Sequence, residues 1–445
     1  MSVDDAVTEP VVVIGAGPVG LAAALLLASE NRPVAVYESH ATLALSDANS
    51  YPIGVNLRGQ EALRRIDPAL LERLRADAQV VAAFRIHAGR RQVAELPSGT
   101  LLATTRAHLT ALLLEAAETN PHITLTTGRR LTRVDVAGKR LLFEDADGAT
   151  HEVDASGARV VAADGVWSAT RTSLAEQLPA FTPDVDPWGV QFRVLFSRPD
   201  AAAPGMDPAC HYIFSDKGIY TSTLKNGVWC LALSLREGDD EAAFLGASEA
   251  TPENVAALER YVTAHAAKAA PLFTDADHAA FFGRGSFTGA VVRCPFVHVD
   301  EWLVLLGDAA HGVIPPTGEG VNSGLEDCCL LAEQMASGSA TPFTDYSTQR
   351  MPDLAALGEY AHHLMENVRD PDPARRFAGV AFRIAGALGK LVGSDVLQVE
   401  GKLFGPQAGR TPYREILGPW LRRRDALFPV LVRVGRVLTR RRRAA

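Results

Sequence analysis

A glycine-rich turn near the start of the sequence constrains the fold more than any other feature. Val11–Ile14 is an apolar run of strand length, Gly15-Ala-Gly-Pro-Val-Gly20 follows it, and Leu21–Ala28 has the Ala/Leu composition of a helix. Val34–Tyr37 is a second apolar run, and it ends at Glu38. A strand, a glycine turn, a helix and a second strand predict a βαβ unit that binds a dinucleotide.

Each glycine of this turn has a physical role in that interpretation. Gly15 makes the sharp turn from strand to helix, Gly17 lets the backbone approach a pyrophosphate, and Gly20 lets the helix pack closely. The helix start presents free N–H groups to the phosphates. Glu38 lies where an acid that binds the ribose is expected, roughly 20 residues along. This unit alone fits FAD and NAD equally.

A second segment indicates which dinucleotide is bound. Trp302–Leu306 reads as a buried parallel strand, and Asp308 follows it. A carboxylate at that edge can accept hydrogen bonds from a sugar-alcohol chain. A proline- and glycine-rich loop over 315–320 then leads into a helix, whose start offers a positive dipole end to an anionic reduced ring. We interpret the segment as the flavin half of an FAD site.

Three motifs together resemble the group A flavoprotein aromatic hydroxylases. They are G-A-G-P-V-G-L at 15–21, A-D-G-V-W-S at 163–168 and G-D-A-A-H at 307–311, in the order and spacing of that family. Within the family, the resemblance is strongest to the kynurenine 3-monooxygenase-like members, above all through E-G-V-N-S-G-L-E-D-C at 319–328. Those members usually have Gln where this chain has Glu319.

The resemblance implies an FAD-dependent monooxygenase that uses NAD(P)H and O2 to hydroxylate a small aromatic substrate. NAD(P)H would reduce the flavin, O2 would add to form a flavin hydroperoxide, and one oxygen atom would pass to an electron-rich ring. The flavin would be the reactive group, so no catalytic side chain is assigned. Asp164 and Gly165 would also serve the NAD(P)H reaction. The residues implied to hold the FAD are Gly15, Gly17, Val19, Gly20, Glu38, Arg106, Asp164, Gly165, Asp308, Gly320, Val321 and Asn322.

Four residues are candidates for contacting the substrate. Asn322 matches a substrate contact of the family. Tyr212, Phe214 and Tyr220 lie on short strands that should cover the flavin, and alternate members of a strand face one side.

The carboxylate clamp of the kynurenine 3-monooxygenase-like members is altered in this chain. Their arginine falls on or beside Asn49, and their two tyrosines fall near Thr100 and Met365. Arginine is the natural bidentate partner of a carboxylate. Kynurenine is therefore expected to be a poor substrate.

The order of elements predicts an α/β fold: a doubly wound, Rossmann-like FAD-binding domain with an antiparallel β-sheet substrate domain and a helical C-terminus. Arg106 opens a helix expected over 104–119. Short alternating strands separated by turn residues predict the antiparallel sheet. The expected division is residues 1–180 for the first part of the FAD-binding domain, 181–290 for the sheet, 291–345 for the return segment and 346–445 for the helical region.

Composition and charge narrow the partners. The net charge of −8 makes a nucleic-acid partner unexpected. The first ten residues do not resemble a signal peptide, and no apolar stretch is long enough to span a bilayer, so a cytoplasmic protein is expected. The cysteines and histidines show no metal-ligand spacing. The tail, apolar over Leu427–Leu438 and closed by Arg440–Arg443, fits a terminal helix docked on the FAD-binding domain or a helix on an anionic membrane surface.

Other classes of protein fit the same motifs. A reductase or dehydrogenase on this fold would oxidise NAD(P)H without inserting oxygen. A non-catalytic flavoprotein would not turn over. A flavin-dependent halogenase is disfavoured, because the sequence has no W-x-W-x-I-P run. The substrate, the choice between NADH and NADPH and the oligomeric state stay open.

Overall fold

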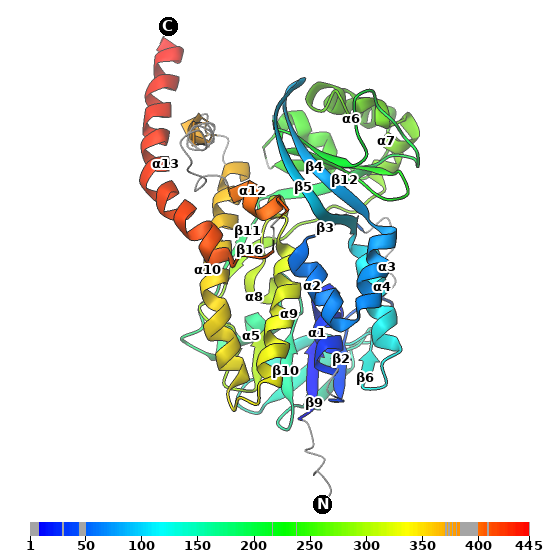
Figure 1. Ribbon diagram of the computed structural model, residues 1–445, viewed down its shortest axis with the longest axis vertical. Helices are drawn as coiled ribbons and strands as arrows, with labels where there is room; N and C mark the ends of the chain where they lie inside the picture. Colours follow the sequence, from blue (N-terminus) through cyan, green and yellow to red (C-terminus); the bar gives the residue numbers. More distant parts are fainter. Residues whose placement is uncertain are drawn as a thin grey trace, which may run out of the picture.

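Two large sheets and a set of C-terminal helices organise the chain (Figure 1). The computed structural model describes residues 9–28, 31–43, 50–215, 217–236, 238–369, 372, 374–375, 377–379, 381–382, 399–406 and 409–444. Asn49, the position of the clamp arginine, lies outside the described residues. The predicted α/β fold class is confirmed.

A six-stranded sheet carries the predicted βαβ unit. Its strand order is β17-β18-β10-β1-β2-β6, and all neighbours are parallel except the edge pair β17 and β18. Every residue of β1 is buried, as expected for a strand covered on both faces. The strands are β1 (Val11–Ile14), β2 (Val34–Tyr37), β6 (Ile123–Thr126), β10 (Arg159–Ala162), β17 (His298–Val299) and β18 (Leu303–Leu305).

The helices beside this sheet enclose α1, which is buried along almost its whole length. α1 packs against α4 and α9. Gly324 allows the approach of α9, because a Cβ there would lie 2.5 Å from Val19 Cγ2. The helices are α1 (Pro18–Ala28), α2 (Leu57–Ile66), α3 (Pro68–Asp77), α4 (Arg106–Glu118), α5 (Ala169–Gln177), α8 (Asp308–His311), the 3-10 turn η4 (Pro315–Thr317) and α9 (Gly320–Ala336). A small sheet joins β7 (Arg130–Asp135), β8 (Arg140–Glu144) and β9 (Thr150–Asp154).

A seven-stranded sheet forms the second layer and extends beyond the predicted range 181–290. Its order is β12-β15-β14-β13-β4-β5-β3, with one parallel pair, β13 and β4, among antiparallel neighbours. The sequence does not predict the hairpin of β4 and β5, because Pro97 and Gly99 interrupt its second strand. The strands are β3 (Pro52–Val55), β4 (Gln79–Ala88), β5 (Arg91–Thr105), β12 (Val190–Phe196), β13 (Cys210–Phe214), β14 (Ile219–Thr223) and β15 (Trp229–Arg236).

Two helices and two 3-10 turns cover one face of this sheet and bury an apolar cluster against it. They are η2 (Asp240–Gly246), α6 (Pro252–His265), η3 (Ala270–Leu272) and α7 (Asp275–Phe282). A two-stranded ribbon, β11 (Asp184–Pro187) and β16 (Ala290–Arg293), lies beside α10. The opposite face of the seven-stranded sheet is therefore free to face the dinucleotide-binding layer.

The C-terminal helices are α10 (Pro342–Arg369), α12 (Val399–Phe404) and α13 (Tyr413–Ala444). The start of α13 packs on α10 through the Trp420 ring, 5.2 Å from that of Tyr360, and Figure 1 shows its far end extending from the molecule. Pro419 and Pro429 lie within α13, although proline weakens a helix. Among the described residues, no helix is long and apolar enough to cross a membrane.

Candidate active site

The glycine turn after β1 has the geometry that the sequence predicts. Gly15 has a φ of 95°, and a Cβ there would lie 2.5 Å from the carbonyl oxygen of Ala163. A Cβ on Gly20 would lie 1.9 Å from the carbonyl oxygen of Gly15. Neither position tolerates a side chain, so the turn and the close packing of α1 both require glycine.

Gly17 differs from its neighbours because the space above it is open. The nearest atom to a Cβ built on Gly17 is Arg106 Nη2, at 3.9 Å. Arg106 opens α4, where Thr105 Oγ1 accepts a hydrogen bond from His108 N at 3.1 Å. A guanidinium facing an open glycine at a helix N-terminus fits a bound pyrophosphate. The sequence placed these two residues in one site, and the structure brings them together.

Glu38 is buried at the end of β2 and is bound to the glycine turn. Its Oε2 accepts a hydrogen bond from Ala16 N at 2.8 Å, and its Oε1 accepts one from His40 N at 2.8 Å. Burial alone would raise the pKa of Glu38, but these hydrogen bonds outweigh it and hold the pKa below its usual value. An ionised carboxylate that also shapes the turn retains lone pairs for ribose hydroxyls.

Asp164 and Gly165 lie directly against the glycine turn. Asp164 Oδ2 accepts hydrogen bonds from Thr170 N at 3.0 Å and Thr170 Oγ1 at 2.9 Å, while its buried Oδ1 has no partner among the described atoms. Gly165 has a φ of 79° and open space where a side chain would stand. A buried acceptor without a partner is costly unless a ligand completes it, so this corner also fits a cofactor.

Asp308 projects from the end of β18 toward the start of α9. A Cβ on Gly320 would lie 4.0 Å from Asp308 Oδ1, so carboxylate and helix N-terminus border the same space. Part of Asp308 remains open to solvent, but the protein around its carboxyl displaces water from it and raises its pKa, against the opposing influence of His311, Arg106 and Arg171. Val321, the next residue of α9, is partly buried.

Asn322 is fully buried, and its amide ties three segments together. Its Nδ2 donates to Gly54 O at 2.8 Å and to Gly318 O at 2.9 Å, and its Oδ1 accepts from Asn56 N at 2.9 Å. Gly59 must be glycine for this contact, because its Cβ would lie 2.7 Å from Asn322 Oδ1. The side chain predicted to touch cofactor and substrate therefore holds the loop before α9 in place.

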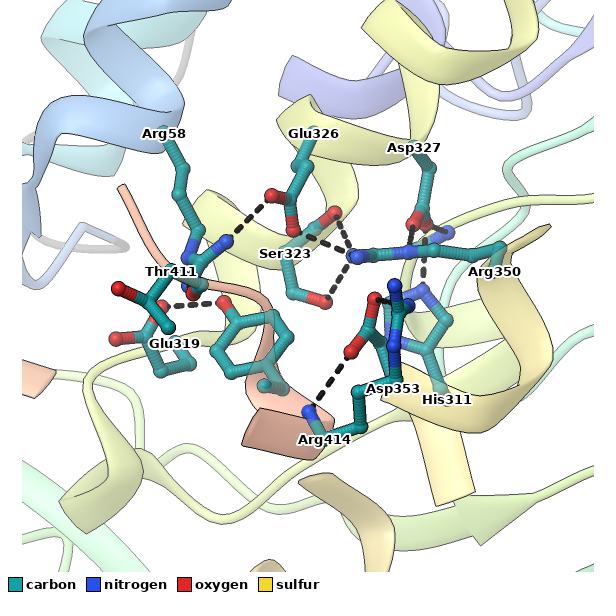
Figure 2. Close-up of polar contacts among 12 residues, drawn as sticks. Arg58, His311, Glu319, Ser323, Glu326, Asp327, Arg350, Asp353, Thr411 and Arg414 are labelled. Atoms are coloured by element: carbon teal, nitrogen blue, oxygen red, sulfur yellow. Dashed lines mark hydrogen bonds and ion pairs between the residues drawn. The ribbon is translucent and has the colours of Figure 1, made fainter. Parts of the chain in front are cut away.

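A buried polar network beneath α9 was not predicted from the sequence (Figure 2). Glu319 Oε2 accepts a hydrogen bond from Tyr413 OH at 2.6 Å, and Asn56 Nδ2 lies 3.2 Å from both carboxylate oxygens. Tyr413 lies 94 residues after Glu319, so no local pattern connects it to the site. Only the part of the network that lies in the 319–328 motif, which contains Glu319, Glu326 and Asp327, has a signal in the sequence.

The other half of this network fixes the junction of β18 and α9. Asp327 accepts from Gly307 N at 2.9 Å and from Arg350 Nε at 2.8 Å, and its Oδ2 lies 2.5 Å from His311 Nε2. Gly307 has a φ of 56°, which the buried hydrogen bond to Asp327 supports. The position of His311 agrees with a structural role.

The three aromatic substrate candidates divide between the two faces of the seven-stranded sheet. Tyr212 and Phe214 point into the apolar cluster under α6 and α7, so the structure does not bring them to the cofactor side. The reason is the strand alternation, which places both on one face of β13. Tyr220 packs on the opposite face, with Phe84 and Phe404.

The face that carries Tyr220 is connected to the loop before α9 and holds uncharged polar groups. Phe404 lies against Gly318, where a Cβ would come within 2.8 Å of its ring. Tyr220 OH forms a short hydrogen bond with His211 Nδ1, and His211 Nε2 is buried without a described partner. Burial lowers the pKa of His211 to about 3, so the imidazole is neutral.

Comparison with known proteins agrees with this geometry. The family described as FAD binding domain matches residues 8–352. The chain is 26% identical to the kynurenine 3-monooxygenase of Neurospora crassa over 79% of this chain and 74% of that protein. It is 27% identical to the kynurenine 3-monooxygenase of Myxococcus xanthus over 83% of this chain and 80% of that protein. The p-nitrophenol 4-monooxygenase PnpA of Pseudomonas putida DLL-E4 shares the fold, with a TM-score of 0.66, 20% identity and coverage of 89% and 98%.

The fold and the site define a flavoprotein, and the chain belongs to the FAD-binding family of aromatic hydroxylases. It is an FAD-dependent monooxygenase of that family. The FAD predicted from the glycine turn and Asp308 is thereby confirmed.

Proposed function

We propose that the chain hydroxylates a small aromatic compound with NAD(P)H and O2, in the space between the start of α9 and the Tyr220 face of the seven-stranded sheet. The observation that carries this is the meeting of Asp308 with Gly320 at the start of α9, next to Gly318, which contacts Phe404 of the neutral, partly aromatic Tyr220 face. FAD supplies the redox and oxygen chemistry when bound. The protein then has to bind and orient the substrate and keep water out of the site.

The proposal gives each part of the FAD site a task. The turn of Gly15, Val19 and Gly20 shapes the cradle, while Gly17 and Arg106 hold the pyrophosphate. Glu38 accepts ribose hydroxyls, and Asp308 accepts those of the ribityl chain. Asp164 and Gly165 complete the cofactor corner and serve the reaction with NAD(P)H, while Gly320, Val321 and Asn322 form the helix start below the ring. In this division, residues 1–180 and 291–345 hold FAD, and 181–290 with β3 to β5 cover the substrate.

The chemistry of the covering wall favours a substrate held by neutral hydrogen bonds. The His211 and Tyr220 pair offers uncharged donors and acceptors. The two clamp positions that the structure describes offer no replacement: the Thr100 carbonyl accepts a hydrogen bond from Gln60, and Met365 of α10 is buried in an apolar core. Kynurenine, which carries a charged carboxylate, is therefore proposed to be a poor substrate.

A panel of small aromatic compounds, kynurenine included, tests this function. Each compound is added to the FAD-loaded protein while NAD(P)H oxidation and O2 uptake are followed together. The proposal expects at least one neutral phenol or aniline to stimulate both signals, and kynurenine to stimulate them weakly. If NAD(P)H is oxidised when another electron acceptor is added, and no O2 is taken up, the result would instead favour a reductase on this fold.

We also propose that α13 binds the anionic cytoplasmic face of a membrane. Four apolar side chains recur along one stripe of the helix and are exposed: Leu427, Val430, Val434 and Val437. Exposed arginines, Arg433 and Arg436 among them, flank the stripe. An apolar stripe flanked by arginine suits an interfacial helix.

Vesicle co-sedimentation tests the membrane contact. The wild-type chain should sediment with phosphatidylserine-containing vesicles at low salt and be released at high salt. The double variant Val430→Asp/Val434→Asp should stay in the supernatant and keep its FAD. Val93→Asp changes an exposed valine on β5 and is the matched control. Equal sedimentation of all three would leave α13 without this role.

A further inference from the structure

Glu319 is a buried carboxyl placed immediately before α9. It is 1% exposed, and its side chain makes no capping hydrogen bond to the helix that follows. Instead the carboxyl turns toward Tyr413 OH and Asn56 Nδ2. Both groups can hydrogen-bond the carboxyl in its charged or neutral form, so the geometry admits either.

The charged groups around Glu319 are committed to other partners. Arg58, from α2, lies 4.0 Å from the centre of the Tyr413 ring and pairs with Glu326 at 2.5 Å. Arg350, from α10, pairs with Glu326 at 2.6 Å and Asp327 at 2.8 Å. In the part of the chain that the structure describes, Glu319 has no ion pair of its own.

The balance of these groups leaves Glu319 near the point of ionisation. Burial raises its pKa to about 7, although Tyr413, Arg58 and Asn56 act to lower it, and Glu326 adds to the rise. Glu319 directly precedes Gly320 in the chain, where the proposed function places the start of the helix below the flavin ring. A negative charge added to that ring would therefore oppose a negative Glu319 in the same poorly solvated region.

We propose that Glu319 is a proton-linked positioning residue, whose carboxyl takes up a proton when the bound FAD is reduced and releases it when the FAD is reoxidised. In each reduction, a hydride with its two electrons passes from NAD(P)H to FAD, and a proton from solvent adds to the Glu319 carboxylate. Reoxidation returns that proton to solvent. The proposal rests on the proposed function for the position of the ring, and it makes the driving force for reduction depend on pH through a named side chain.

The test is the midpoint potential of the FAD-loaded full-length protein, measured by spectroelectrochemistry from pH 5 to pH 9. Wild type and Glu319→Gln should agree at the acidic end, where the carboxyl is protonated in both redox states. At the alkaline end, the variant should have the higher potential. Because linkage is reciprocal, a tenfold rise in proton affinity on reduction corresponds to about 30 mV for this two-electron couple.

Two further variants make the assignment specific. Glu333→Gln makes the same change near the other end of α9, at a side chain that is 44% exposed and paired with Arg65, and it should follow wild type. Tyr413→Phe removes a hydrogen bond that lowers the pKa of Glu319, so its curve should separate from that of Glu319→Gln at a higher pH than wild type does.

Parallel curves for wild type and Glu319→Gln at every pH would overturn the proposal. If Glu319→Gln does not retain FAD, proton uptake by wild type on electrochemical reduction at pH 8 decides: an uptake clearly above one proton per FAD supports the linkage, and an uptake of one proton contradicts it. A wild-type protein that held FAD but hydroxylated nothing would instead contradict the proposed function, and would leave this measurement intact.

Discussion

At the scale of single residues, the glycine turn shows how backbone geometry predicts chemistry. Gly15 and Gly20 are glycines because neighbouring backbone fills the place of a side chain. Gly17 is different, since a side chain would fit the protein alone and would collide only with a ligand. This distinction separates a folding requirement from a binding requirement.

Gly17→Val should therefore fold and lose FAD. Its nearest neighbour is 3.9 Å from the added Cβ, so unfolding by urea should change little, while the valine fills the place of the pyrophosphate. Absorbance of the purified protein near the flavin bands gives the bound fraction. Gly157→Val, at another position with open space, should stay yellow. If Gly17→Val still bound FAD at full occupancy, the glycine turn would not be part of the FAD site.

Glu319 should also make stability depend on pH. Its pKa in the folded protein, about 7, lies above the usual value of 4.5, so the folded state binds more protons between those values. The stability that protonated Glu319 adds to the folded state is fully present below about pH 4.5. As the pH rises to 7, up to about 3 kcal/mol of unfolding free energy is lost. Urea unfolding should show Glu319→Gln gaining stability relative to wild type from pH 5 to pH 8. No relative gain would mean that the carboxyl is already ionised at pH 5.

At the scale of elements, the sequence predicts what is locally encoded. β1, α1 and β2 follow from apolar runs around a glycine turn, and the strand before Asp308 follows from its buried character. β4 and β5 escape prediction because Pro97 and Gly99 lie within a real strand. The face of Tyr212 also escapes it, because helices cover one side of its sheet and the cofactor layer lies at the other, so both faces are buried.

The tie between β3, α2 and α9 depends on the Asn322 amide. Asn322→Ala leaves Asn56 N, Gly54 O and Gly318 O with one buried partner fewer each, which should cost about 2–4 kcal/mol of unfolding free energy. FAD affinity should fall as well, because the loop before α9 loses its anchor. Asn226→Ala, at an exposed turn asparagine, should cost less than about 1 kcal/mol. Equal losses in both variants would contradict the anchoring role.

At the scale of the whole molecule, segments far apart in the sequence meet at one site. The glycine turn, the loop before α9 and Tyr413 of α13 come from the beginning, the later part and the end of the chain (Figure 1). The sequence signal for these segments differs: a strong motif marks the glycine turn, and no motif marks Tyr413. A tertiary contact made by a single hydroxyl leaves no period or spacing to detect.

The central claim is that this chain inserts oxygen into an aromatic substrate, and labelled O2 tests it most directly. The FAD-loaded protein, NAD(P)H and the most stimulating compound of the aromatic panel are incubated under heavy-oxygen O2, and the product is analysed by mass spectrometry. The account predicts a product that carries one labelled oxygen atom on its ring. Label that is found only in peroxide or water, for every compound that stimulates NAD(P)H oxidation, would contradict it.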